Sequence, residues 1–167
     1  MVRQMKPLDA VPLFNSPMET GLRAVIVLDA CFPKRLDVTS LSWLDHLVVH
    51  TADIGGPASL HPNVPQRTGE LLVRRRLIED GLSLMRKLHL IEIAGDETGF
   101  TYKITEEATA FVDSLNTKYA STLKDRARWL ADLLEERDYD LSNLIDEKIG
   151  RWALEFQTEN NAPGKLL

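Results

Sequence analysis

Between residues 45 and 61, three histidines and two carboxylates have the residue types of a small metal site. His46 and His50 are four positions apart, a spacing that places both imidazoles on one face of a helix. Asp53 or His61 would complete a ligand shell of the kind that zinc takes. The segment has neither an H-E-x-x-H arrangement nor a second pair at fixed spacing. We therefore assign no metal site, although a metal hypothesis would rest on His46, His50 and His61.

The alternative interpretation of the same residues is structural. On a helix over residues 38–50, Asp45, His46 and His50 share a polar face with Ser42. Histidines on such a face hydrogen-bond to neighbouring groups. We expect them to hold the loop that follows, and we favour this interpretation over the metal site.

Arginines form a second cluster, which consists of Arg67, Arg74, Arg75 and Arg76. Arginines at the start of a long helix can contact phosphates and base edges. Acidic residues one turn further along, Glu79 and Asp80, can instead neutralise two of these arginines. Arg74 falls within the apolar arc of the helix, where its charge needs a partner. Binding of a protein partner or an internal ion pair is favoured, and DNA contact stays open.

The sequence lacks the motifs that position catalytic groups. Cys31 lies in an apolar run without a histidine in a fixed motif, which indicates a buried structural thiol. No nucleophile elbow surrounds a serine. The Gly55-Gly56-Pro57 segment lacks the preceding strand and the glycine spacing of a phosphate loop. We expect a protein that is not an enzyme and that holds no cofactor.

The elements that position these residues can be predicted from hydrophobic periodicity and capping residues. Ser16 or Asn15 followed by Pro17 predicts a helix start, and the nearly all-apolar run 21–31 predicts a helix in the middle of a core, ended by Phe32-Pro33. Asp37 caps a second helix over 38–50. Residues 51–68 show no periodicity, which predicts a long loop. A loop of this length inside a compact domain is usually functional.

The rest of the chain predicts a long helix, a hairpin and further helices. The longest helix covers residues 69–88, and short β runs at 90–93 and 100–104 flank a turn at 95–99. Helices follow at 106–115, 119–137 and 140–157. Three helices, a hairpin and more helices is the chain order of a winged-helix domain. The predicted fold is therefore mainly α with a small β-hairpin, in which the 69–88 helix takes the recognition position.

The predicted domain organisation has four parts. Residues 1–14 form an N-terminal arm, 15–117 the winged-helix-like domain, 118–157 a C-terminal helical extension, and 158–167 a flexible tail. The extension carries apolar residues at helical spacing, which favour core packing and a homodimer or partner groove about equally: Trp129, Leu130, Leu133, Leu134, Ile145, Ile149, Trp152 and Phe156.

Charge and hydropathy narrow the class of protein. The net charge is −5; residues 1–105 hold 12 basic and 12 acidic residues, and residues 106–167 hold 8 basic and 13 acidic ones. A dedicated nucleic-acid-binding domain is usually basic, so binding of DNA through bulk charge is not expected. No apolar run reaches the roughly 18 residues of a membrane span, and no apolar segment follows the N-terminus. We expect a cytoplasmic protein that binds no membrane.

Short motifs give the chain a family resemblance from about Phe14 to Leu134. It resembles middle-component family 2 of bacterial ABC-three-component systems in four segments: Phe14–Ala24 (FNSPMETGLRA), Leu47–Asp53 (LVVHTAD), Gly56–Pro62 (GPASLHP) and Arg67–Arg75 (RTGELLVRR). From Asp140 onward the chain matches nothing that we can name.

The resemblance implies a function. Such systems look like genome-defence modules in which an SMC- or Rad50-like ABC ATPase, a small middle protein and an effector act together. The resemblance implies that this chain is a non-enzymatic adaptor that links the ATPase to the effector. The 53–69 loop and the arginines beside it would form the docking surface. A winged-helix transcription regulator is the alternative, and a small metal-dependent enzyme built on the three histidines is a third reading.

Overall fold

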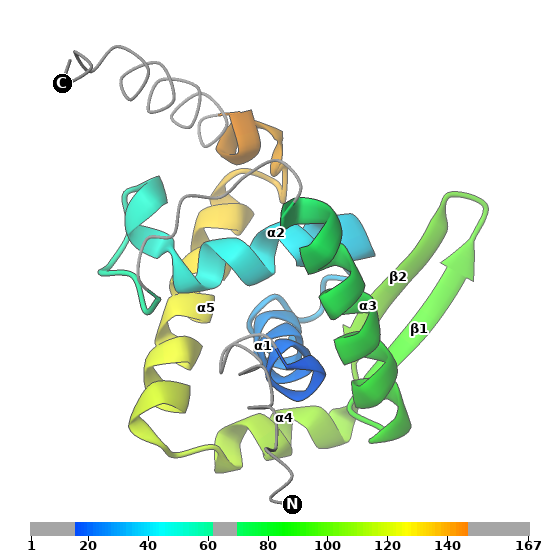
Figure 1. Ribbon diagram of the computed structural model, residues 1–167. Helices are drawn as coiled ribbons and strands as arrows, with labels where there is room; N and C mark the ends of the chain where they lie inside the picture. The colour runs from blue at the N-terminus through cyan, green and yellow to red at the C-terminus, as the bar shows by residue number, and fades with distance from the viewer. Residues whose placement is uncertain (1–15, 62–69, 147–167) are drawn as a thin grey trace, which may run out of the picture.

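The computed structural model describes residues 16–61 and 70–146 of the 167. Its elements follow in the order α1 (Pro17–Ala30), α2 (Val38–Val49), the 3-10 helix η1 (Thr51–Ile54), α3 (Glu70–Lys87), β1 (Ile91–Asp96), β2 (Gly99–Ile104), α4 (Glu106–Ser114) and α5 (Lys118–Glu136). Residues 142–146 are again helical. The prediction of a mainly helical chain with one β-hairpin is confirmed (Figure 1).

Capping side chains begin the helices at the predicted residues. The Ser16 side chain accepts a hydrogen bond from the Glu19 backbone N–H at 3.2 Å, and Pro17 follows as the first helical residue. Asp37 accepts from the Ser40 N–H at 2.7 Å. Each cap satisfies an N–H group that has no partner within its own helix. The first two helices therefore start where local sequence chemistry places them.

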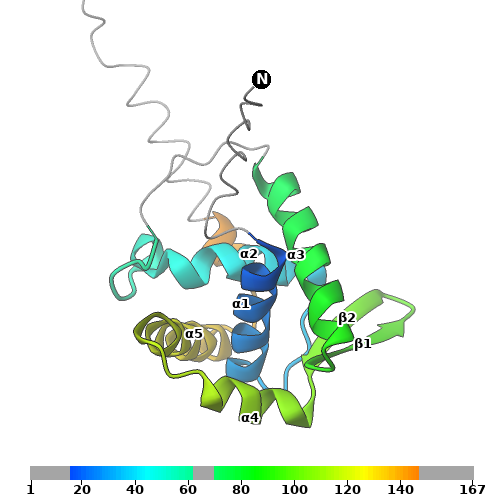
Figure 2. The ribbon, with the colours of Figure 1, turned by 60° about the horizontal axis from the view of Figure 1, so that its bottom comes forward.

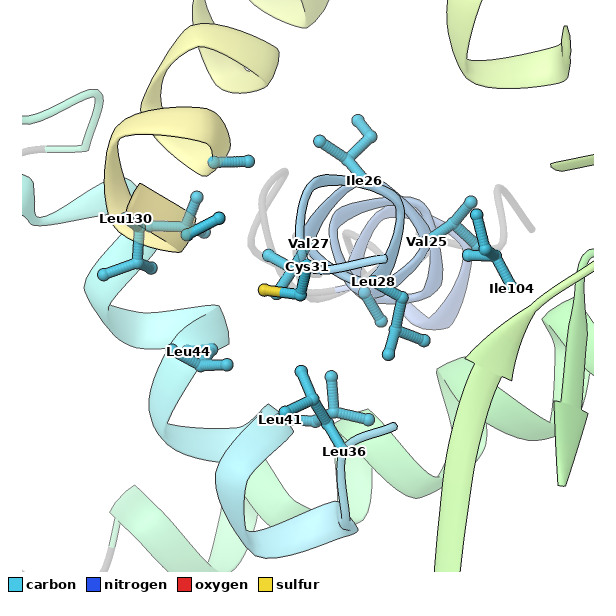
Figure 3. Packing of buried hydrophobic residues seen from close by; sticks show 14 of the residues in the cluster. Val25, Ile26, Val27, Leu28, Cys31, Leu36, Leu41, Leu44, Ile104 and Leu130 are labelled. Carbon is cyan, nitrogen blue, oxygen red and sulfur yellow. The ribbon is translucent and has the colours of Figure 1, made fainter. Parts of the chain in front are cut away.

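Helix α1 is the centre of the fold. It runs between α3 on one side and α5 on the other, with α4 across one end (Figure 2). Its apolar run from Ala24 to Leu28 is at most 4% exposed, and side chains from α2, β2 and α5 close around it (Figure 3). A helix that is apolar on nearly every side can be stable only when neighbours cover every side. The predicted core position of this segment is confirmed.

Two glycines allow α1 and α3 to approach closely. A Cβ atom on Gly81 would lie 2.7 Å from the backbone N of Gly21, and a Cβ on Gly21 would lie 2.8 Å from the carbonyl oxygen of Gly81. Side chains at either position would hold the two backbones apart. The crossing therefore fixes the position of α3 against the central helix.

The hairpin is antiparallel, with Ile91 opposite Ile104 and Asp96 opposite Gly99. Its turn is tighter than predicted, because the strands continue to Asp96 and leave only Glu97 and Thr98 between them. The Asp96 carboxylate accepts hydrogen bonds from the backbone N–H and the hydroxyl of Thr98. The hairpin projects from the helices beside α3 (Figure 1).

A short third segment joins the hairpin. Leu36, between α1 and α2, forms an isolated antiparallel bridge with Tyr102, through hydrogen bonds of 3.0 and 2.8 Å. The bridge ties the base of the hairpin to the start of α2. The hairpin is therefore attached to the core by backbone bonds as well as by the chain connection.

Helix α5 belongs to the same hydrophobic core as the preceding helices. Leu123, Ala127, Leu130 and Leu134 are at most 3% exposed and face α1 and α2. Trp129 and Leu133 pack partly buried against this core. The predicted boundary between residues 117 and 118 and the homodimer stay predictions, and this stretch of the apolar stripe is used within the chain.

Several predicted segments lie outside the described residues, among them the arm 1–14, the tail 158–167 and the distal stripe residues Ile149, Trp152 and Phe156. Within residues 16–61 and 70–146, no helix has the length and apolar character needed to span a membrane.

Candidate functional site

The outer face of α3 carries the exposed members of the arginine cluster. Arg75 and Arg76 are exposed, as the predicted polar arc requires. Arg75 pairs with Glu79 at 3.3 Å, and its guanidinium also donates to the Thr39 hydroxyl. The helical pairing of Arg75 with Glu79 is confirmed. An exposed pair of this kind contributes only about 0.3–0.5 kcal/mol, so it leaves Arg75 able to exchange partners. Arg67 lies outside the described residues.

Arg74 points inward and meets the counter-charge that its position demands. Its Nη1 lies 2.5 Å from Oδ2 of Asp45, a carboxylate on α2 that is only 2% exposed. Arg23 of α1 approaches the same carboxylate, with Nε 2.6 Å from Oδ1 and Nη2 3.3 Å from Oδ2. One buried carboxylate therefore joins cations from two helices, and α1, α2 and α3 are locked together by it. We call Arg23, Asp45 and Arg74 the ion triad.

Arg23 is the member of the ion triad that sequence reasoning missed. It is 2% exposed and lies within the apolar run of α1. Burial by itself lowers the pKa of Arg23, but the Asp45 carboxylate, with smaller contributions from Tyr119 and Glu19, raises it, and the net shift is upward. An arginine inside an otherwise apolar core helix requires a buried carboxylate in the same way as Arg74 does. That requirement was readable in the sequence, but the identity of the partner was not, because Asp45 lies 22 residues away.

The histidines of the first cluster lie in a row beside the ion triad. The ring centroids of His46 and His50 are 4.4 Å apart, and those of His50 and His61 are 6.2 Å apart. Nε2 of His61 lies 2.8 Å from the hydroxyl oxygen of Tyr119 on α5. His61 belongs to the segment that follows α2, and this contact ties the segment to α5; that the α2 histidines hold the loop stays a prediction. Tyr119 was not predicted to take part.

The polar face of α2 is buried. Ser42, Asp45, His46 and His50 are all at most 6% exposed, although the sequence placed them opposite the apolar face. The reason is that α1 and α3 supply the two arginines that meet Asp45, and the His61 ring from the segment after η1 lies against His50. In the part of the chain that the structure describes, no three His, Cys, Asp or Glu side chains are grouped so that they could hold a metal ion.

Electrostatics keep the His61 imidazole neutral near pH 7. Burial lowers its pKa first, the Arg23 and Arg74 cations lower it further, and Asp45 opposes part of this effect; the resulting pKa is about 4. Burial likewise raises the pKa of Tyr119, so the phenol keeps its proton. The contact between the two side chains is therefore a hydrogen bond between neutral groups.

The segment predicted as a long loop is structured in its first part. Residues Thr51–Ile54 form η1, which corrects the prediction of an irregular segment from 51 onward. Short hydrogen bonds then fold the chain back: the Thr51 hydroxyl donates to the Pro57 carbonyl at 2.8 Å, and the Leu60 and His61 N–H groups both donate to the Val49 carbonyl. Periodicity could not reveal one turn of 3-10 helix. Asp53 lies half-buried in η1.

Helix α5 supports the same segment from the other side. Arg126 donates to the Ala58 carbonyl at 3.1 Å, and the indole of Trp129 lies against Gly56, where an added Cβ would approach it to 2.5 Å. Residues 51–61 are thus held between α2 and α5. Residues 53–61, the described half of the 53–69 loop, therefore have a fixed structure.

Large apolar side chains are also exposed on α3, after its end and on the hairpin. Val73 on α3 is 61% exposed, Leu88 after its end 49%, and Phe100 on β2 66%. We call the exposed residues of α3 together with Leu88 and Phe100 the α3–hairpin surface. Large apolar side chains beside charged ones are typical of surfaces that bind other proteins. Bases and acids alternate here, since Glu79 and Asp80 lie between the arginines and the Arg86-Lys87 pair.

Comparison with known proteins places the chain in a family. Searches against curated proteins and against solved structures gave no match. A family model described as "ABC-three component (ABC-3C) system Middle Component 2" matches residues 13–155. The match continues past Leu134, where the resemblance in sequence motifs was expected to stop, and covers most of the chain. The chain therefore belongs to the Middle Component 2 family of ABC-three-component systems.

Proposed function

We propose that the chain is a non-enzymatic adaptor that links an SMC- or Rad50-like ABC ATPase to an effector in a bacterial defence system. Its family supplies the role of a middle component among several proteins. The observation that carries the proposal for this chain is the two-sided character of α3. Its inner face is fixed to the core by Arg74 and Asp45, while its outer face stays exposed.

The physical advantage of this arrangement is preorganisation. A helix held rigidly by buried contacts loses little conformational entropy when a partner binds its outer face. Val73, Leu88 and Phe100 offer apolar area, and Arg75 and Arg76 offer charged groups that fix the orientation of a partner. We propose the α3–hairpin surface as the docking surface for the ATPase.

The winged-helix fold remains our proposal for the architecture. The chain order of three helices and a hairpin supports it, and so does the Leu36–Tyr102 bridge, which lies where a winged helix has its first short strand. A winged-helix transcription regulator is the second candidate function. The exposed Arg75 and Arg76 favour it, whereas the internal use of Arg74 and the acids Glu79 and Asp80 on the same helix weigh against it.

Co-purification tests the adaptor role. The chain is co-expressed with the ABC ATPase encoded beside its gene, and the complex is captured with and without ATP. We expect Arg76→Glu to reduce capture at least about tenfold, as loss of a well-placed interface charge does. The control Arg128→Glu changes a residue that is equally charged and 67% exposed on α5, and it should leave capture unchanged. Absence of any complex in every nucleotide state would refute the proposal.

A salt titration of DNA binding separates the second candidate. A protein that neutralises several phosphates loses affinity steeply as salt rises. Sequence-specific binding to the chain's own promoter, with a steep slope that Arg76→Glu flattens, would favour the regulator. The adaptor proposal expects no binding at low salt.

A further inference from the structure

A pocket opens on the surface where the ends of α1 and α5 meet, outside the α3–hairpin surface. Its volume is about 290 Å³, and its lining includes Ala30, Phe32, Lys34, Asp132, Glu135 and Tyr139. Pockets that enclose cofactors and drug-sized ligands usually measure about 300–1,000 Å³. This hollow is at the small end, so it suits one side chain of a partner better than a free ligand.

The rim of the pocket has a negative electrostatic potential. Asp132 and Glu135 are exposed and lie one helical turn apart on α5, so their carboxylates share one face. The pocket also lies at the C-terminal ends of α1, at Ala30, and of α5, at Glu136. A helix C-terminus carries a partial negative charge that attracts cations. Two carboxylates and two helix ends therefore outweigh the single ammonium of Lys34.

Aromatic rings supply a second feature that selects cations. Lys34 Nζ lies 5.0 Å from the centroid of the Tyr139 ring, a cation–π contact within the pocket wall. Phe32 is 65% exposed at the same pocket. The contact of Lys34 with Tyr139 shows that the site accepts a cation. Among the described residues, no lysine forms a cation–π contact with Phe32, so the Phe32 ring offers a further face.

We propose that this pocket binds an arginine side chain from a basic segment of a partner protein. A planar guanidinium stacks on an aromatic face and at the same time donates two parallel hydrogen bonds to a carboxylate. A lysine ammonium is a point charge and cannot make both interactions well. Phe32 provides the face, and Asp132 and Glu135 provide the acceptors. Lys34 competes for the same negative potential, so the lysine limits the affinity of the site.

NMR titration of the full chain tests the proposal with a defined probe. The probe is a capped Ala-Arg-Ala tripeptide, and its counterpart carries neutral citrulline in place of arginine. We expect saturable shifts of the backbone amides of residues 32, 34 and 131–139 with the arginine peptide only. Phe32→Ala should weaken binding about fivefold, as loss of one exposed cation–π contact does. Asp132→Asn combined with Glu135→Gln should abolish saturation.

Three further variants make the test sharp. Lys34→Ala should tighten binding, because it removes the competing ammonium; a merely structural lysine would give no change or a loss. Glu136→Gln, an exposed acid next to the pocket but not in its wall, and Phe100→Ala on the hairpin should both leave binding unchanged.

The outcomes that overturn the proposal are equally definite. Equal shifts with the citrulline peptide would show that the guanidinium charge is not recognised, and absence of saturable shifts would show that no site exists. A dimer in sedimentation experiments that Phe32→Ala dissociates would assign the pocket to a second copy of this chain instead of a partner. None of these results bears on docking at α3.

Discussion

Arg74 of α3 reaches across to α2, where its Nη1 lies 2.5 Å from Oδ2 of Asp45. Arg23 holds the other carboxylate oxygen from α1, so the two arginines share one buried anion. Removing one partner of such a group leaves a buried charge uncompensated, and this costs more than the group as a whole contributes. The helix that we propose as docking surface is therefore fixed by the ion triad beneath it.

The first prediction concerns the ion triad. Asp45→Leu should lower the free energy of unfolding by about 3–5 kcal/mol, because two cations lose their counter-charge. The triple variant Arg23→Met, Asp45→Leu, Arg74→Met removes every charge and should recover most of that loss. Urea denaturation measures both. The exposed Asp125→Asn is the control and should change stability by less than about 0.5 kcal/mol. A triple variant as unstable as Asp45→Leu alone would contradict the electrostatic explanation.

The second prediction concerns the crossing of α1 and α3. Gly81→Ala should destabilise the fold by about 1–3 kcal/mol, because its Cβ meets the Gly21 backbone at 2.7 Å. On an exposed helix site the same change would stabilise, since alanine favours helices. Ser83→Ala, two residues further on the exposed side of α3, is the matched control and should be neutral or slightly stabilising. Thermal unfolding of the two variants should therefore move in opposite directions.

The third prediction is a pH dependence that originates at His61. Its pKa is about 4 in the folded chain and about 6.5 when unfolded. Between these values the unfolded chain binds a proton that the folded chain excludes, so stability falls as pH falls through this window. One proton contributes at most about 1.4 kcal/mol per pH unit. His61→Gln does not titrate, so the difference between wild type and variant should be constant above pH 7 and shrink toward pH 4. A constant difference throughout would contradict the prediction.

The fourth prediction concerns the anchoring of residues 51–61. Gly56→Val places a side chain where the Trp129 indole lies, so the segment should detach from α5. Hydrogen exchange of the Leu60 and His61 amides, which donate to the Val49 carbonyl, should accelerate by at least about tenfold while exchange in α1 stays slow. Gly55 has no atoms near its Cβ position but has a φ of +80°, so Gly55→Asn, which tolerates that conformation, is the control. Equal exchange in all three proteins would show that Trp129 does not hold the segment.

Local rules predicted much of the fold. The caps at Ser16 and Asp37 and the apolar run of α1 each depend on a few adjacent residues, and each was correctly placed. The need of Arg74 for a partner also follows from its position on one helix. These features were readable because their physical causes lie within a turn or two of chain.

Contacts between distant segments were the part that the sequence did not reveal. Arg23 and Asp45 are 22 residues apart, and His61 and Tyr119 are 58 apart, so neither pair leaves a trace in periodicity. For the same reason the polar face of α2 was not recognised as buried, since the arginines that meet Asp45 come from α1 and α3. Helical projection tells which side chains share a face but not what that face meets.

Hydroxyl-radical footprinting of the chain, alone and in complex with the ABC ATPase that we propose as its partner, tests the central claim most directly. Val73, Leu88 and Phe100 are 61%, 49% and 66% exposed in the chain alone and should be oxidised readily. In the complex we expect their oxidation to fall at least about fivefold, a degree of shielding consistent with burial at an interface core, whereas Trp129 on α5 keeps its rate. Unchanged oxidation of all three side chains in a complex that forms stably would contradict docking at the α3–hairpin surface.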